Sequence, residues 1–184
     1  MKKYKLTLIE IIGVVALIVI LALIGIAAYS YAADSSKEKA SKATVLRLES
    51  ALNMLKDKGV TPLKTGSDYV EIIFDADNKI VKFGTIEVGE KSGKEDAFKM
   101  FARAMDADSI DSLLDKTDKS ITDGWGQKIL IRYPGKFNRG GFDIISAGSD
   151  GGFGEDSAAA PPTDIAKYKD TDGEQICDDV ANFL

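Results

Sequence analysis

Apolar residues fill the beginning of the chain almost without interruption. Residues 11–33 contain no charged side chain and read IIGVVALIVILALIGIAAYSYAA, a run of 23 positions. As a helix rising ~1.5 Å per residue, this run reaches roughly 35 Å, which is enough to cross the hydrocarbon core of a bilayer. A helix half-buried in a soluble domain carries a polar stripe, and here no polar side chain precedes Tyr29. The pattern therefore predicts a membrane-spanning helix over residues 6–33.

Lysines at positions 2, 3 and 5 form a basic leader over residues 1–5. Basic residues beside an apolar segment favour the cytoplasmic side, so we expect a single-pass protein with its N-terminus in the cytoplasm. A cleaved secretory signal peptide is the alternative interpretation. The apolar run is too long for that and continues without a break into a helical pattern, which favours a permanent anchor.

The helical spacing continues beyond the apolar run. Four apolar residues recur at i, i+3, i+7 and i+10 and so share one face of a helix. They are Val45, Leu48, Leu52 and Leu55. Gly59 and Pro62 follow, and both are typical of the end of a helix. We therefore expect an amphipathic continuation of the same helix over residues 34–60.

Strand patterns dominate the rest of the chain. The runs Tyr69–Phe74 and Lys79–Phe83 are rich in β-branched and aromatic residues, and Asp and Asn in the segment between them indicate a hairpin turn. A second pair, Lys128–Tyr133 and Gly141–Ser146, is separated by a segment that contains Pro and Gly. The fold class is therefore α+β: one long helix packed on a small antiparallel sheet, within a globular domain over residues 61–184.

Residues 94–116 separate the two strand pairs and carry apolar side chains at helical spacing. This spacing predicts a further helix over residues 94–116. Phe98, Phe101 and Met105 are expected to be core contacts of this helix and not parts of a ligand site.

Charge and the rarest residue types narrow the function classes. Residues 143–184 hold ten acidic groups and two lysines, whereas residues 34–142 are close to neutral. This acidity argues against nucleic acid as a partner, because phosphate binding requires clustered Lys and Arg. The chain has no histidine and one cysteine, Cys177, which excludes His-based triads, His-ligated zinc and an internal disulfide. A membrane-anchored periplasmic enzyme remains an alternative, but the sequence offers it only scattered carboxylates.

One carboxylate stands at the edge of the apolar run. Glu10 is costly there unless it is paired or lies at the membrane interface. After the basic leader, the sequence LTLIE at residues 6–10 resembles the class III signal of type IV pilins and of type II secretion pseudopilins. The resemblance implies that a prepilin peptidase cuts before Leu6, that the new amine is methylated, and that Thr7 and Glu10 act in filament assembly. Lys5 stands where the family has Gly, so we expect slower cleavage.

A second motif carries the same resemblance. The sequence DGWG at residues 123–126 precedes the second strand pair, and SAGSDGG follows it at residues 146–152. Major pseudopilins have an Asp-x-Trp-Gly segment, a strand pair and a Ser-x-Gly-x-Asp-Gly loop in this order. The resemblance covers residues 6–62 and 122–154, and the segment between them shares only the general order of elements.

In major pseudopilins this loop and a following acidic segment fold around one Ca²⁺. The resemblance implies that Asp150 is a ligand in this chain, and carboxylate and carbonyl oxygens are the ligands that calcium prefers. Asp178 and Asp179 match the second acidic segment best, with Asp164 as the alternative. We therefore expect the acidic loop over residues 146–184 to bind Ca²⁺; an acidic tail without a metal is the other interpretation.

Together the two motifs predict a structural subunit and not an enzyme. The resemblance implies that it polymerises through the N-terminal helix into a helical homo-oligomer, either a type II secretion pseudopilus or a surface type IV pilus for adhesion or motility. Its partners would be the prepilin peptidase and an inner-membrane assembly platform. Before assembly the subunit is expected in the inner membrane, and the filament in the periplasm or outside the cell.

Overall fold

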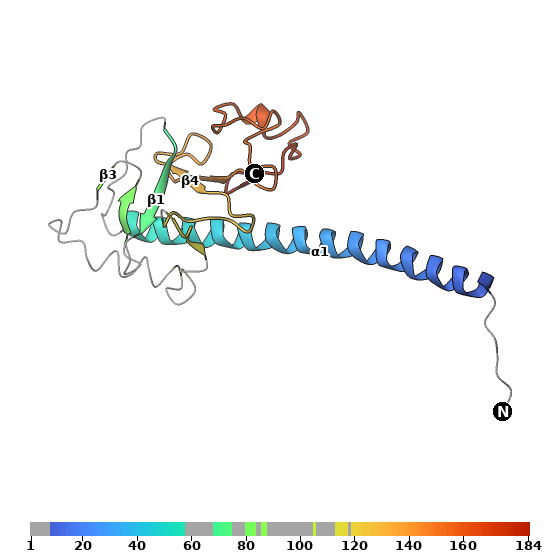
Figure 1. The fold of residues 1–184 in the computed structure, drawn as a ribbon. Coiled ribbons are helices and arrows are strands. Elements are labelled where there is room, and N and C mark those ends of the chain that lie inside the picture. Colours follow the sequence, from blue (N-terminus) through green and yellow to red (C-terminus); the bar gives the residue numbers. More distant parts are fainter. Residues whose placement is uncertain are drawn as a thin grey trace. The chain divides into compact units, whose positions relative to one another are not determined.

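The computed structural model describes residues 8–57, 68–74, 80–83, 86–87, 105, 113–117 and 119–184 (Figure 1). The chain divides into two compact units, Met1–Ser36 and Lys37–Leu184. The described part of the first unit is helical throughout. The second unit contains the rest of the helix, the sheet and the C-terminal segment.

One helix, α1 (Leu8–Asp57), runs through 50 residues without a break. Its sequence contains no proline, so every backbone N–H past the first turn can donate within the helix. The predicted continuity between the apolar run and the amphipathic segment is confirmed. The N-terminal part of α1 is long and apolar enough to cross a membrane. The predicted stop at Gly59 and Pro62 lies outside the described residues.

Within the described residues, the sheet contains six strands in the order β3-β2-β1-β4-β5-β6, and all neighbours are antiparallel. The strands are β1 (Val70–Phe74), β2 (Ile80–Phe83), β3 (Ile86–Glu87), β4 (Ile129–Arg132), β5 (Asp143–Ser146) and β6 (Val180–Ala181). Both predicted strand pairs are confirmed, since β1 pairs with β2 and β4 with β5. The strands β3 and β6 have two residues each, too few to produce a recognisable alternation.

Side chains alternate across β4 and β5, so the two faces of the sheet belong to different cores. Ile129, Ile131 and Ile144 pack in the core that contains the amphipathic part of α1. Leu130 and Ile145 point the other way, into a second core formed with the C-terminal segment. The second unit therefore has three layers: α1, the sheet and the C-terminal segment.

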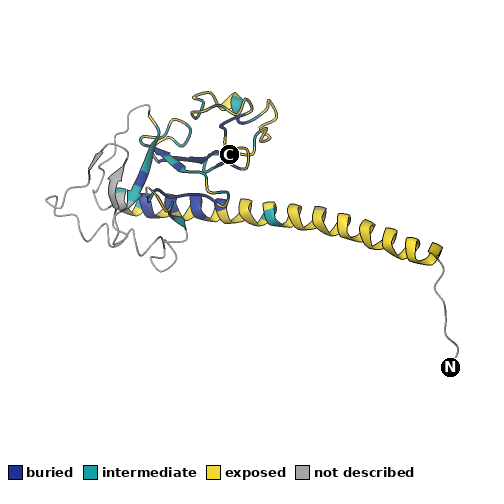
Figure 2. Ribbon diagram, in the orientation of Figure 1, coloured by how far each residue is buried: buried dark blue, intermediate teal, exposed yellow. Residues whose placement is uncertain are grey.

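The amphipathic part of α1 contributes its predicted face to the first core. Val45, Leu48 and Leu52 are buried, as is Ala51 between them. Figure 2 shows buried positions along the part of α1 that belongs to the second unit. The side chain of Leu55 lies outside the described residues. The predicted packing of the helix on an antiparallel sheet is therefore confirmed.

The predicted helix over residues 94–116 is corrected at its C-terminal end. Leu114 forms an isolated antiparallel bridge with Ile121, so the backbone there is extended. Both side chains are buried in the first core, where the bridge brings them together. Met105 is buried in the same core, as predicted. Phe98 and Phe101 lie outside the described residues.

The C-terminal segment is more ordered than the single acidic loop that the sequence predicts for residues 146–184. It consists mostly of turns, but it includes the 3₁₀ helix η3 (Ile165–Lys167) and ends with β6 on the edge of the sheet. Three of its apolar side chains explain this order, because they pack against the sheet or the second core. They are Phe153, Tyr168 and Val180.

The motif DGWG contacts α1 through backbone atoms. The N–H of Gly124 donates to Ser41 Oγ at 2.9 Å, and that hydroxyl donates to the carbonyl of Lys37 at 2.8 Å. A Cβ on Gly124 would lie 2.6 Å from the same carbonyl oxygen. Glycine is therefore required at position 124 so that this turn can approach the helix.

Replacing Gly124 by alanine is expected to lower the free energy of unfolding by about 1–3 kcal/mol, because the new methyl group overpacks a backbone contact. Thermal unfolding of the full chain in detergent measures the change. Gly25→Ala is the matched control, since a Cβ at position 25 meets nothing within 4 Å. Equal melting temperatures for Gly124→Ala and the unmodified chain would contradict this account of the contact.

Candidate functional site

The predicted assembly residue Glu10 lies in the first turn of α1 and is exposed. Its carboxylate is placed favourably there, since the helix dipole is positive at that end. Lys5, Leu6 and Thr7 lie outside the described residues. The apolar side chains that follow Glu10 are exposed as well, from Ile11 to Ile26 (Figure 2). Among the residues that the structure describes, none packs an apolar side chain over this part of α1.

The predicted calcium ligands lie in the C-terminal segment, where Asp178 holds the loop that precedes Asp150. Oδ2 of Asp178 accepts hydrogen bonds from the N–H and Oγ of Ser149 at 2.7 and 2.6 Å, and from the N–H of Asp150 at 3.0 Å. The carboxylate thus satisfies two backbone donors of a tight turn. It joins residues that are 28 positions apart in the sequence.

Asp150 uses its own carboxylate inside the loop. Oδ1 accepts from the N–H of Gly152 at 2.8 Å, and Oδ2 accepts from the hydroxyl of Ser157. These hydrogen bonds, with that from Ser157 the stronger, lower the pKa of Asp150 because they stabilise its charged form. Asp150 is therefore ionised at neutral pH.

Asp179 is the buried member of the group, with 1% of its surface exposed. Oδ2 accepts from the N–H of Gly154 at 2.6 Å. Oδ1 is buried, and no described residue donates a hydrogen bond to it. Burial raises the pKa of Asp179, and the nearby carboxylates of Asp178 and Asp150 raise it further. The charges of Asp178 and Asp150 therefore disfavour the ionised form of Asp179.

The loop closes on Asp178 only because position 148 is glycine. Gly148 has φ +66°, and a Cβ there would lie 2.2 Å from the carbonyl oxygen of Asp178. An L-residue is strained at this φ and would also collide with the facing backbone. The glycine in the Ser-x-Gly-x-Asp-Gly sequence is therefore needed for the contact between the loop and the second acidic segment.

The other acidic candidates lie apart from this group. Asp164 caps η3, where its carboxylate accepts from the N–H of Ala166 at 3.1 Å. Asp170 accepts from the N–H groups of residues 172 and 174, both at 2.9 Å, and so closes its own turn. Of the two predicted partners for Asp150, the structure brings Asp178 and Asp179 to its loop and leaves Asp164 elsewhere.

Burial raises the pKa of the Cys177 thiol to about 12, so it stays protonated at neutral pH.

The oxygen atoms of this loop are of the kind that a hard cation binds, but the described side chains do not surround a common position. Carboxylates and loop carbonyls are calcium ligands, and Asp179 Oδ1 is a buried oxygen in need of a partner. Within the described ranges, no three acidic or Cys side chains converge closely enough to hold a metal ion. A bound Ca²⁺ would therefore compete with the N–H groups that Asp150 and Asp178 now cap.

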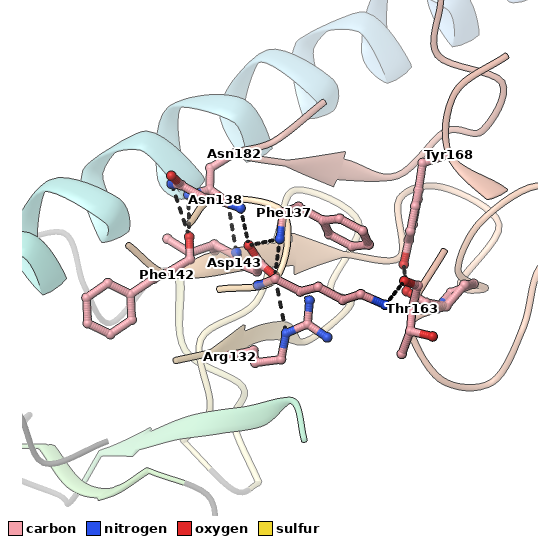
Figure 3. Close-up of polar contacts among 11 residues, drawn as sticks. Arg132, Phe137, Asn138, Phe142, Asp143, Thr163, Tyr168 and Asn182 are labelled. Atoms are coloured by element: carbon pink, nitrogen blue, oxygen red, sulfur yellow. Dashed lines mark hydrogen bonds and ion pairs between the residues drawn. The ribbon is translucent and has the colours of Figure 1, made fainter. Parts of the chain in front are cut away.

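A buried ion pair connects β4 and β5, and the sequence analysis did not predict it. Arg132 and Asp143 are 2% and 0% exposed, and their side chains form a salt bridge (Figure 3). Asp143 also accepts from the N–H groups of Lys136 and Asn138, at 2.7 and 2.8 Å. The Arg132 guanidinium lies 4.5 Å from the centroid of the Tyr69 ring. The pair therefore organises the turn between the two strands.

The pairing register of the hairpin could have predicted this ion pair. Arg132 and Asp143 are direct partners in the antiparallel ladder, so a register centred on the turn would have placed the two charges opposite each other.

A second group that the sequence analysis did not predict is Glu49 on α1. Its Oε1 accepts from Asn138 Nδ2 at 3.0 Å and from Asn182 Nδ2 at 2.8 Å. Glu49 thus fastens the turn and the C-terminus to the helix.

The described residues therefore define an exposed apolar helix and a loop held by aspartates. The exposed apolar side chains of the helix form a surface suited to hydrophobic association. No family model matches the chain, and no curated protein or solved structure was found to be similar to it.

Proposed function

We propose that this chain is a non-enzymatic structural subunit that polymerises through α1 into a pseudopilus or a type IV pilus-like filament. One observation carries the proposal: the apolar side chains from Leu8 to Ile26 are exposed along the whole N-terminal part of α1. Such a surface is not stable in water, because burying it gains about 25 cal/mol per Å². A bilayer covers it before assembly, and helices of neighbouring subunits cover it afterwards.

The two sequence motifs support a filament over a simple membrane anchor. A simple anchor has no need for a carboxylate at the start of its apolar run, whereas Glu10 can pair with the terminal amine of a neighbouring subunit. The amine becomes available when a prepilin peptidase removes residues 1–5. An inner-membrane assembly platform then adds the subunit to the filament.

Electron microscopy tests the proposal directly. Cells that express the chain with its assembly machinery are expected to carry filaments labelled by an antibody against residues 119–184. Fibres that shear from the cell surface indicate a pilus, and fibres confined to the periplasm indicate a secretion pseudopilus. A chain that stays monomeric in the membrane under these conditions would overturn the proposal.

We also propose that the C-terminal loop binds Ca²⁺ through Asp150, Asp178 and Asp179. The motivation is the repulsion that Asp178 and Asp150 exert on the carboxylate of Asp179, together with its buried Oδ1, to which no described residue donates a hydrogen bond. A cation at this place would stabilise the folded loop, because it binds the folded form and not the unfolded chain.

In saturating Ca²⁺ the full chain in detergent is expected to melt about 5–10 °C higher than in chelator, which corresponds to roughly 2.7 kcal/mol of binding linkage. Mg²⁺ should substitute poorly, because it requires a compact octahedral shell and retains its waters. Asp150→Ala should abolish the difference between Ca²⁺ and chelator. Asp164→Ala is the matched control and should preserve it. If the unmodified chain melts at the same temperature in both buffers, the loop binds no calcium.

A further inference from the structure

Aromatic residues occur at only one place along α1. Its 50 residues contain no Phe or Trp and two tyrosines, Tyr29 and Tyr31. Their side chains are 77% and 80% exposed, so neither contributes to a core of the chain. Both stand at the end of the apolar run, and the next charged residue is Asp34.

The two rings point to nearly opposite sides of the helix. Successive residues of an α-helix are rotated by about 100°, so residues 29 and 31 are separated by about 200° around the axis. A partner helix that packs along one stripe would contact one ring and leave the other outside. A planar boundary between lipid and water surrounds the helix and contacts both. The positions of Tyr29 and Tyr31 therefore favour a membrane interface over a protein surface.

The distance to the other end of the apolar run agrees with this. Glu10 and Tyr29 are 19 positions apart, which is about 28 Å along a helix and matches the thickness of about 30 Å for a hydrocarbon core. When the tyrosines lie at one surface of the bilayer, Glu10 lies at the other. Its carboxylate is then among headgroups and water and not in hydrocarbon, where it would be costly.

We propose that Tyr29 and Tyr31 bind the headgroup layer of the bilayer and fix the depth of α1 in the membrane before assembly. A tyrosine ring has an apolar body and a polar hydroxyl, so it is most stable where lipid meets water. The inference rests on the proposed membrane insertion, and it names the side chains that fix the depth of α1 in the bilayer. The depth determines whether Glu10 is presented at the opposite surface.

Cysteine accessibility tests the depth directly. The full chain carrying Cys177→Ser is reconstituted into vesicles of phosphatidylcholine and phosphatidylglycerol, and single cysteines are labelled with a membrane-impermeant maleimide. Lys39→Cys normalises the labelling, because position 39 is exposed and lies beyond the apolar run. The remaining positions are Val19→Cys, Ala28→Cys, Ala32→Cys and Ser35→Cys.

With both tyrosines present, labelling is expected to begin between positions 28 and 32. The variant Tyr29→Ala/Tyr31→Ala removes both tyrosine hydroxyls from the end of the apolar run, so the boundary should move by about one helical turn and Ala32→Cys should become protected. Tyr29→Trp/Tyr31→Trp should retain the original boundary, since Trp prefers the same layer. An unchanged boundary in the alanine variant overturns the role of the tyrosines but leaves insertion intact. Labelling of Val19→Cys as strong as that of Lys39→Cys overturns insertion, and with it the proposed function.

Discussion

Asp143→Ala is expected to lower the free energy of unfolding by about 3–5 kcal/mol, which is the cost of leaving a buried charge without its partner. Arg132 is 2% exposed and cannot reach water from its position in β4. The substitution also removes the acceptor for the backbone N–H groups of Lys136 and Asn138. A loss of this size approaches the whole stability of many domains. We therefore expect a large fall in melting temperature or a failure to fold.

Two further variants separate the charge from the packing. Arg132→Met/Asp143→Leu removes both charges and should recover much of the loss, because a buried ion pair is replaceable by apolar residues of similar volume. The surface pair between Lys42 and Glu38 is the matched control, with both side chains at least half exposed. Glu38→Ala should change the stability by less than about 1 kcal/mol. Equal effects of Asp143→Ala and Glu38→Ala would show that the buried pair does not organise the hairpin. Urea unfolding of the full chain in detergent, followed by Trp125 fluorescence, measures all of them.

Glu10→Leu is expected to leave the chain in the membrane and to abolish filaments. The substitution makes the apolar run longer, so insertion does not suffer. In the proposed filament, however, the substitution removes the carboxylate that would pair with the terminal amine of the neighbouring subunit. Close interfacial charge pairs contribute about 1.5–7 kcal/mol, so each subunit contact should weaken at least tenfold. A polymer repeats this loss at every contact, which explains why we expect the filament to disappear and not merely to shorten.

Filament number and length by electron microscopy, with membrane content by fractionation, measure this effect. Glu10→Gln keeps the shape of the side chain and removes its charge, and should also fail to polymerise. Glu38→Gln makes the same chemical change on the exposed part of α1 and should assemble normally. Filaments of normal length from Glu10→Gln would show that the charge at position 10 has no role in assembly.

The elements with a long periodic pattern could be predicted from the sequence. The helix α1 was foreseen because 23 uncharged residues and the spacing of Val45, Leu48 and Leu52 are visible in any short window. The hairpin of β4 and β5 was foreseen for the same reason. The spacing of apolar residues before Leu114 predicts a helix, but Leu114 forms a β-bridge. Apolar residues three and four positions apart occur in both kinds of structure. Local spacing does not distinguish the two when the partner, Ile121, is unknown.

The candidate site was predictable only in part. The glycines and Asp150 of the loop were conspicuous in the sequence, and so was the acidity of residues 143–184. The sequence did not decide between Asp164 and Asp178 as the partner of this loop, because both follow the loop at distances that a chain of turns can span. The structure shows Asp178 on the N–H groups of residues 149 and 150, and Asp164 at the start of η3.

The long helix, its apolar half and the two principal strand pairs follow from the amino-acid sequence, since each depends on side chains close together in the chain. Which distant polar groups meet depends on how the domain packs. Asp143 became the counter-ion of a buried arginine because the hairpin register sets the two residues opposite each other. Asp179 has a carboxylate oxygen that is buried and accepts no hydrogen bond from the residues that the structure describes. Burial changes the energy of such groups by several kcal/mol, and burial depends on the packing of the whole domain and not on neighbours in sequence.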